Sequence, residues 1–265
     1  MNLSHSPKTS LFERAAATDA SYFEMAAEVE ELPGAVLAWM PGLTSLAAGA
    51  VVQRVDGEAV TRVGERWVPE IERALGKVGA PLARVYLAAE SPAAGLLQQA
   101  GYVMRPELVF AHQMEPEVGA LDLCPVQSDE AWDRKKKLHE EADRTPDGHP
   151  SSASKWVELE RRKAADGLEN YLAMRDGEVV GAIGAIRGDN ILRLKNILIH
   201  PDHRRRGLGR GMLDALAALG RESGILEQTV YAVRGNAGER LYRACGMRVI
   251  GSVVEWSKRL GESNR

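Results

Sequence analysis

The stretch Leu194-Lys-Asn-Ile-Leu-Ile-His-Pro-Asp-His-Arg-Arg-Arg-Gly-Leu-Gly-Arg-Gly-Met212 is the most informative part of this chain. An apolar strand stops at Pro201 and passes through a basic, glycine-rich loop into a helix. Glycines let a backbone approach a ligand closely. The free N–H groups and the dipole at a helix start favour an anion there. The arginines of the loop add positive charge, so the stretch predicts a binding site for a phosphate or pyrophosphate.

The two most familiar phosphate loops do not fit these residues. A dinucleotide loop reads G-x-G-x-x-G, but the third glycine position is Met212, and three arginines precede the first glycine. A Walker loop reads G-x-x-x-x-G-K-[ST], and nothing in the chain matches it.

The residues around this loop predict an α/β fold with a mixed sheet. Hydrophobic periodicity and turn residues give the order β-α-α-β-β-β-α-β-α-β for the C-terminal half. The expected strands are 119–127, 171–174, 179–186, 191–199, 228–233 and 247–256, and the expected helices are 129–142, 151–165, 207–223 and 236–245.

The loop and one later motif resemble the GNAT (GCN5-related N-acetyltransferase) superfamily. Its loop signature is [RQ]-x-x-G-x-[GA], which Arg204, Gly207 and Gly209 fill. Its second marker, L-Y-x-x-x-G-[FM], resembles the run from Leu241 to Met247. The resemblance covers roughly residues 119–258, and the element order agrees with it.

The resemblance implies an enzyme that transfers an acetyl group from acetyl-CoA to a primary amine of a small molecule or peptide, without a metal. It implies that the loop amides hold the pyrophosphate, that the strand at 197–199 binds the pantetheine arm, and that the Tyr242 hydroxyl protonates the departing thiolate. The cofactor-binding residues expected are Ile197, Leu198, Ile199, Arg204, Arg205, Arg206, Gly207, Leu208, Gly209, Arg210, Gly211 and Asn236.

Asn236 departs from the family pattern. The family commonly carries an asparagine seven residues before the tyrosine, where this chain has Gly235. Either the helix starts after a one-residue deletion and Asn236 meets the cofactor, or Asn236 acts mainly as a helix N-cap.

The general base is left open by the sequence. Some family members carry a carboxylate on the strand before the loop, where this chain has Arg193, Lys195 and Asn196. The two cations hint at an acceptor that bears a carboxylate. The candidate bases are His149, His200, Glu169 and Glu255, and residues 143–152 are a candidate lid.

An internal repeat explains the length of 265 residues. Shifted by 145 positions, Val85-Tyr86 falls on Val230-Tyr231, Leu96 on Leu241 and Gly101 on Gly246. The N-terminal half is expected to hold helices at 11–31, 62–76 and 92–100 and strands at 35–40, 47–55, 83–88 and 103–113.

The N-terminal copy has lost the motif residues. It has Ala59, Arg62 and Leu97 where the C-terminal copy has Arg204, Gly207 and Tyr242. We therefore expect a tandem GNAT protein: a degenerate, non-catalytic domain at 1–116, a linker at 116–119 and a catalytic domain at 117–265. The N-terminal copy would cover the sheet edge that single-domain relatives cover by dimerising, which gives a monomeric pseudo-dimer or a homodimer.

Composition narrows the remaining classes. There are 34 basic and 37 acidic residues, for a net charge of −3, too balanced for general affinity to nucleic acid or membranes. Two distant cysteines, Cys124 and Cys245, fit neither a disulfide framework nor a zinc site, and indicate a reducing cytoplasm. No apolar run is long enough to span a membrane, and the start of the chain lacks the apolar core of a signal peptide. The alternative function is a non-catalytic acyl-CoA sensor.

Overall fold

The computed structural model describes residues 9–113, 121–142 and 152–261. Its C-terminal half follows the element order expected from the sequence. The elements are β6 (Asp122–Pro125), α5 (Asp129–Ala142), α6 (Ala153–Ala165), β7 (Glu169–Arg175), β8 (Glu178–Arg187), β9 (Ile191–Ile199), the short 3-10 helix η2 (Pro201–His203), α7 (Leu208–Glu222), β10 (Glu227–Val233), α8 (Ala237–Ala244) and β11 (Arg248–Arg259).

The N-terminal half repeats this plan in shorter form. Its elements are α1 (Leu11–Glu24), β1 (Glu28–Leu32), β2 (Ala35–Trp39), β3 (Ala50–Gln53), α2 (Gly57–Val63), the 3-10 helix η1 (Gly64–Arg66), α3 (Trp67–Lys77), β4 (Leu82–Ala88), α4 (Ala93–Gln99) and β5 (Val103–Gln113).

Two sequence expectations for this half were wrong. The helix at 11–31 ends at Glu24, because Met25 leaves the helical region and Ala26 takes a positive φ of 53°. The residues after it form β1, which pairs with β2 from Glu28 to Leu32. The single helix at 62–76 is instead two helices joined by η1, with a positive φ of 66° at Gly64.

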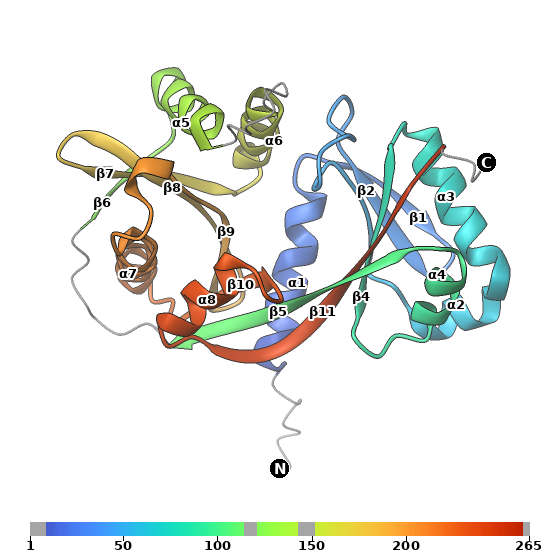
Figure 1. Ribbon diagram of the computed structural model, residues 1–265. Helices are drawn as coiled ribbons and strands as arrows, with labels where there is room; N and C mark the ends of the chain where they lie inside the picture. Colours follow the sequence, from blue (N-terminus) through green and yellow to red (C-terminus); the bar gives the residue numbers. More distant parts are fainter. Residues whose placement is uncertain (1–8, 114–120, 143–151, 262–265) are drawn as a thin grey trace, which may run out of the picture.

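The eleven strands of the described residues form one sheet, in the order β1-β2-β3-β4-β11-β5-β10-β9-β8-β7-β6. The two halves exchange their last strands. β5, from the N-terminal half, pairs with β10, whereas β11, from the C-terminal half, pairs with β4. β5 and β11 also pair with each other, antiparallel, and run side by side through the middle of the molecule in Figure 1.

The exchange places each last strand in the core of the other half. Leu108 and Phe110 of β5 pack with α7 and α8 of the C-terminal half. Val254 and Trp256 of β11 pack with α3 and α4 of the N-terminal half. Burial of such apolar side chains contributes ~1.5–3 kcal/mol each, so neither half can part from the other without losing core.

The internal repeat extends to the secondary structure. Shifted by 145 residues, Leu82–Ala88 falls on Glu227–Val233, and β5 falls on the first eleven residues of β11. Among the described residues, no helix is both long enough and apolar enough to cross a membrane.

Candidate active site

The site begins where two parallel strands of the sheet diverge. β9 and β10 pair only over Ile191–Arg193 and Glu227–Thr229. Beyond Arg193, β9 keeps its pairing with β8, in which Leu198 faces Ala182 and Ile199 faces Gly181. Residues 197–199, the expected pantetheine-binding segment, therefore lie on a strand whose ladder to β10 has already ended.

A bulge at Asn196 sets the course of β9 beside this opening. Asn196 has a φ of 50°, and the register with β8 shifts between Ala182 and Gly184. The Asn196 amide donates to Glu160 Oε1 at 2.7 Å, and Glu160 is fully buried against Lys135 Nζ at 2.8 Å. A buried, paired polar group holds an uncommon backbone conformation in place.

The basic loop after β9 ends at an uncapped helix. Gly207 takes a left-handed φ of 77° and stands at the N-cap of α7, where no side chain accepts from the first-turn amides. Those N–H groups therefore remain available to an anion. Arg204, Arg205 and Arg206 are exposed around them, and Arg204 Nε also donates to the Ile199 carbonyl at 3.3 Å.

Other loop residues have packing roles. A Cβ on Gly209 would come within 2.8 Å of Leu241 in α8, and one on Gly211 within 2.8 Å of Leu121. Arg210 donates to the Ala244 carbonyl at 2.6 Å, so its guanidinium lies against the end of α8. Packing against Leu121 and α8 therefore fixes the course of the loop at these three positions.

Asn236 is an N-cap, one of the two alternatives left open by the sequence. Its Oδ1 accepts from Glu239 N at 2.8 Å, and Glu239 Oε2 accepts from Gly235 N at 2.6 Å. The two bonds fix the start of α8, with the Glu239 carboxylate on the N–H of Gly235, the residue before the N-cap. Any contact of Asn236 with a cofactor would use its Nδ2 amide.

Tyr242 lies on the inner face of α8, 6% exposed, with its ring 5.6 Å from that of Phe110. Burial raises the pKa of Tyr242 to about 12, so its hydroxyl is protonated at neutral pH. The residue lines a cavity of about 270 Å³, which we call the central cavity. This cavity also meets β9 at Leu194–Ile197 and β10 at Val230 and Tyr231.

Both halves build the central cavity. The N-terminal half contributes α1, the loop between β2 and β3, and β4; the exchanged strands β5 and β11 contribute Arg105, Glu107 and Glu255. Tyr22 of α1 lines the central cavity, and the Lys195 ammonium lies 3.8 Å from the centroid of its ring. The half that lacks the motif residues therefore supplies much of the wall.

The two cations of β9 form ion pairs with one carboxylate of α1. Asp19 Oδ1 accepts from Arg193 Nη2 at 2.6 Å and from Lys195 Nζ at 2.8 Å. Burial acts to raise the pKa of Asp19, but the two cations outweigh it and hold that pKa below its usual range. Arg193 and Lys195 thus share one carboxylate within the chain, and the expected acceptor carboxylate stays a prediction.

Glu107 is the functional candidate that sequence reasoning missed. Burial raises the pKa of its carboxyl, with Arg105 opposing the shift, and its side chain is 12% exposed. Its bond to Arg105 is long, 3.4 Å. Glu255 is more fully engaged, accepting from Arg105 at 2.7 Å and from the Tyr86 hydroxyl at 2.8 Å. The sequence did not indicate a functional role for Glu107, because it lies in a strand of the N-terminal half, which carries no motif.

The remaining candidate bases lie elsewhere. His200 contacts Glu141 at 3.1 Å beside α5, and Glu169 accepts from Arg187 and Tyr171; neither lines the central cavity. His149 and most of the candidate lid at 143–152 lie outside the described residues. Within the described ranges, no group of three or more His, Cys, Asp or Glu is placed to hold a metal ion.

Comparison with known proteins connects this geometry to a family. The model of the Acetyltransferase (GNAT) family matches residues 133–247. A GCN5-related N-acetyltransferase from Kribbella flavida has a similar structure, with 16% identity and a TM-score of 0.63 over 92% of this chain and 95% of that one. A GCN5-related N-acetyltransferase from Sphaerobacter thermophilus has 20% identity and a TM-score of 0.58 over 86% and 77%.

A third structure bears on the two-part architecture. It is a tandem GNAT protein from the clavulanic acid biosynthesis pathway, with 16% identity and a TM-score of 0.54 over 87% of this chain and 79% of that one. At such identities the likeness is one of fold. The fold and the loop motif define an acyltransferase. Residues 133–247 therefore belong to the acetyltransferase (GNAT) family, and the chain over most of its length has the fold of a tandem GNAT protein.

Proposed function

We propose that this protein is an N-acetyltransferase that moves an acetyl group from acetyl-CoA to a primary amine of a small molecule or peptide. The observation that carries the proposal is the meeting of Tyr242, the diverging strand β9 and the half-buried carboxylate Glu107 in one cavity. The acetyl group, the amine and the active site in the C-terminal half are parts of this proposal.

Acetyl-CoA suits the groups that are present. The uncapped amides at Gly207–Arg210, with Arg204, Arg205 and Arg206 around them, form an anion site for its pyrophosphate. Ile197–Ile199 would bind the pantetheine arm along the free side of β9, and Leu208 and Gly211 would add backbone contacts. The acetyl group would then enter the central cavity, which Tyr242 lines. Acetyl-CoA supplies an activated acyl group, and metal chemistry plays no part in the proposal.

Two side chains would move the protons. The amine must lose a proton as it attacks the thioester carbon, and Glu107, whose pKa is raised by burial, accepts it. The Tyr242 hydroxyl donates a proton to the sulfur as the carbon–sulfur bond breaks, and backbone amides of β9 polarise the carbonyl. The products are the N-acetyl amine and the free thiol of CoA.

The proposal includes a domain boundary between residues 116 and 117 and a non-catalytic N-terminal domain. Its strand β3 is followed by Asp56, whose Oδ1 accepts from Glu58 N at 2.9 Å and from Ala59 N at 3.2 Å. A carboxylate thus occupies the helix start where a phosphate would bind. We further propose a cytoplasmic protein, in accord with its two free cysteines.

The decisive experiment measures thiol release from acetyl-CoA with a panel of amines: amino acids, polyamines, aminoglycosides and peptides. The proposal predicts amine-dependent thiol release with at least one class. Binding of CoA, seen as a rise in melting temperature, with no thiol release from any amine would favour the alternative, a non-catalytic acyl-CoA sensor.

A further inference from the structure

A second cavity lies where the N-terminal strands diverge. β3 and β4 are parallel and pair at a single position, Val52 with Val85. Arg54, just after β3, has a φ of 50°, the same value as Asn196 in β9. The N-terminal half therefore keeps the diverging strands of the C-terminal half, although its loop has lost the phosphate-binding glycines.

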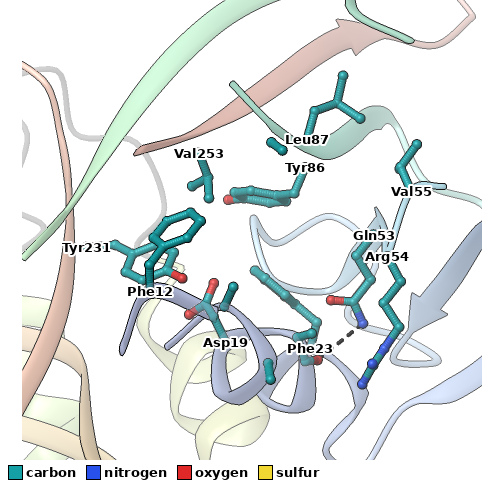
Figure 2. Close-up of a pocket in the computed structure, with 14 residues that line it drawn as sticks. Phe12, Asp19, Phe23, Gln53, Arg54, Val55, Tyr86, Leu87, Tyr231 and Val253 are labelled. Atoms are coloured by element: carbon teal, nitrogen blue, oxygen red, sulfur yellow. Dashed lines mark hydrogen bonds between the residues drawn. The ribbon is translucent and has the colours of Figure 1, made fainter. Parts of the chain in front are cut away.

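This second cavity has a volume of about 300 Å³ and largely apolar walls. Figure 2 shows Phe12 and Phe23 of α1, Tyr86 of β4 and Val253 of β11 around it. An apolar cavity of ~150 Å³ can bind benzene, so this one has room for an alkyl or aromatic group. Asp56 caps α2 beyond it, which disfavours the pyrophosphate of a second CoA.

The second cavity adjoins the central cavity. Four side chains line both: Asp19 and Phe23 of α1, Tyr86 of β4 and Tyr231 of β10. Tyr86 and Tyr231 occupy equivalent positions in the two halves, 145 residues apart. A ligand that passes between these two rings would reach from the second cavity to Glu107 and Tyr242.

Two buried polar atoms on this wall have no hydrogen-bond partner within the described part of the chain: the Tyr231 hydroxyl and Gln53 Oε1. Gln53 uses its Nε2 on the Ala20 carbonyl and on Glu24, so only its oxygen is left. A buried polar group without a partner is costly in a folded protein. An alkyl or aromatic group offers neither atom a hydrogen bond, so such a ligand would be recognised by the apolar walls of the second cavity and not by these two atoms.

We propose that the second cavity is the specificity pocket of the acceptor, and that the acceptor is a primary amine carrying a compact alkyl or aromatic group. The inference rests on the proposed function only in naming the ligand as the acceptor. The apolar group lies between α1, β4 and β11, and the amine extends into the central cavity beside Glu107. The former cofactor cleft of the degenerate half thereby becomes part of the acceptor site.

Binding of 4-phenylbutylamine and butylamine to the full chain, each in the presence of CoA, tests the proposal by calorimetry without any transfer. We expect the phenyl compound to bind at least ~10-fold more tightly, from burial of its ring. Ala16→Leu, which fills the second cavity from α1, should abolish this preference and leave the affinity for CoA unchanged. The control Ala165→Leu adds the same bulk at an exposed site on α6 and should preserve the preference for the phenyl compound.

Equal affinity for the two amines in the wild type, or a preference that survives Ala16→Leu in a folded variant, would overturn the proposal. Circular dichroism and melting establish that the variant is folded. The two levels of inference fail separately. If the wild type prefers the phenyl compound, Ala16→Leu loses that preference and no amine is acetylated, the proposed function is refuted and the specificity pocket stands. If an amine is acetylated but the phenyl compound is not preferred, the specificity pocket is refuted and the proposed function stands.

Discussion

Glu107 of β5 and Glu255 of β11 lie on neighbouring antiparallel strands, and both accept a hydrogen bond from the guanidinium of Arg105. Each of these strands packs in the half of the molecule opposite to the half of the sequence it comes from. The distances are 3.4 Å from Glu107 and 2.7 Å from Glu255. The arginine thus holds Glu255 more closely and leaves Glu107 the freer carboxylate in the central cavity. The proposed active site needs both halves of the chain, because the loop motif comes from the C-terminal half and Glu107 from the N-terminal half.

Replacing Glu107 by Gln tests its role as proton acceptor. Burial raises the pKa of Glu107, and the ionised form is the active one, so wild-type kcat/KM should fall as the pH drops through that raised value. Glu107→Gln should lower kcat ~10²-fold or more and remove this pH dependence. Glu28→Gln, an exposed strand glutamate in β1, is the matched control.

The stability of the same variant separates chemistry from folding. Because the folded-state pKa of Glu107 is raised, its ionisation opposes folding at neutral pH. Glu107→Gln should therefore melt at the wild-type temperature or above it near pH 7. A large drop in melting temperature together with lost activity would assign Glu107 a structural role instead.

Tyr242→Phe removes the proposed proton donor and keeps the ring that packs on Phe110. We expect kcat to fall ~10²-fold or more, with the affinity for CoA and the melting temperature little changed. Tyr102→Phe, in the N-terminal half, removes another buried tyrosine hydroxyl away from the central cavity and serves as the control. Turnover near that of the wild type in Tyr242→Phe would refute the assignment.

Gly207→Ala tests the phosphate-binding loop. Gly207 has a φ of 77° with open space around its Cα, so the substitution forces a side chain into the left-handed region. The strain is ~1–2 kcal/mol. The loop can relieve this strain by changing its conformation, which should weaken CoA binding. Gly101→Ala meets the same conformation, φ 81°, far from the loop. Equal CoA affinity in both variants, measured by calorimetry, would contradict the assigned role of the loop.

Asp19→Asn tests the ion cluster between the halves. The substitution leaves Arg193 and Lys195 buried without a countercharge, which should cost ~3–5 kcal/mol of unfolding free energy. The pKa of Asp19 is lowered in the folded state, so its stabilisation is present above the unfolded carboxyl pKa and is lost as the pH falls through the lowered value. The melting difference from wild type should shrink in acid. The exposed control Asp189→Asn should show no such difference at any pH.

Much of the fold was predictable because local patterns are strong. α5, β5 and β9 begin and end at their expected residues, since charge clusters, glycines and prolines mark their ends. β1 was missed because Glu28, Glu30 and Glu31 give it the composition of a continuing helix. The strand exchange was not predictable, because β5 and β11 have similar apolar patterns and their choice of partner is a long-range contact.

The site was predictable where backbone conformation requires a particular residue, as at Gly207. It was not predictable where the function depends on a neighbour distant in sequence. Glu107 lines the same cavity as Tyr242 only because β5 crosses into the other half, and Arg193 is paired with a carboxylate only because α1 brings Asp19 to it. Sequence reasoning on each half alone could find neither relationship.

The most direct test of the whole account is the stoichiometry of the reaction with the best amine of the panel: thiol released against N-acetylated amine formed. The account predicts one acetylated amine for each thiol in the wild type. It predicts neither product above background when Glu107→Gln and Tyr242→Phe are combined, although that variant still binds CoA. Thiol release without an acetylated amine, or CoA binding with no thiol release from the wild type, would contradict it.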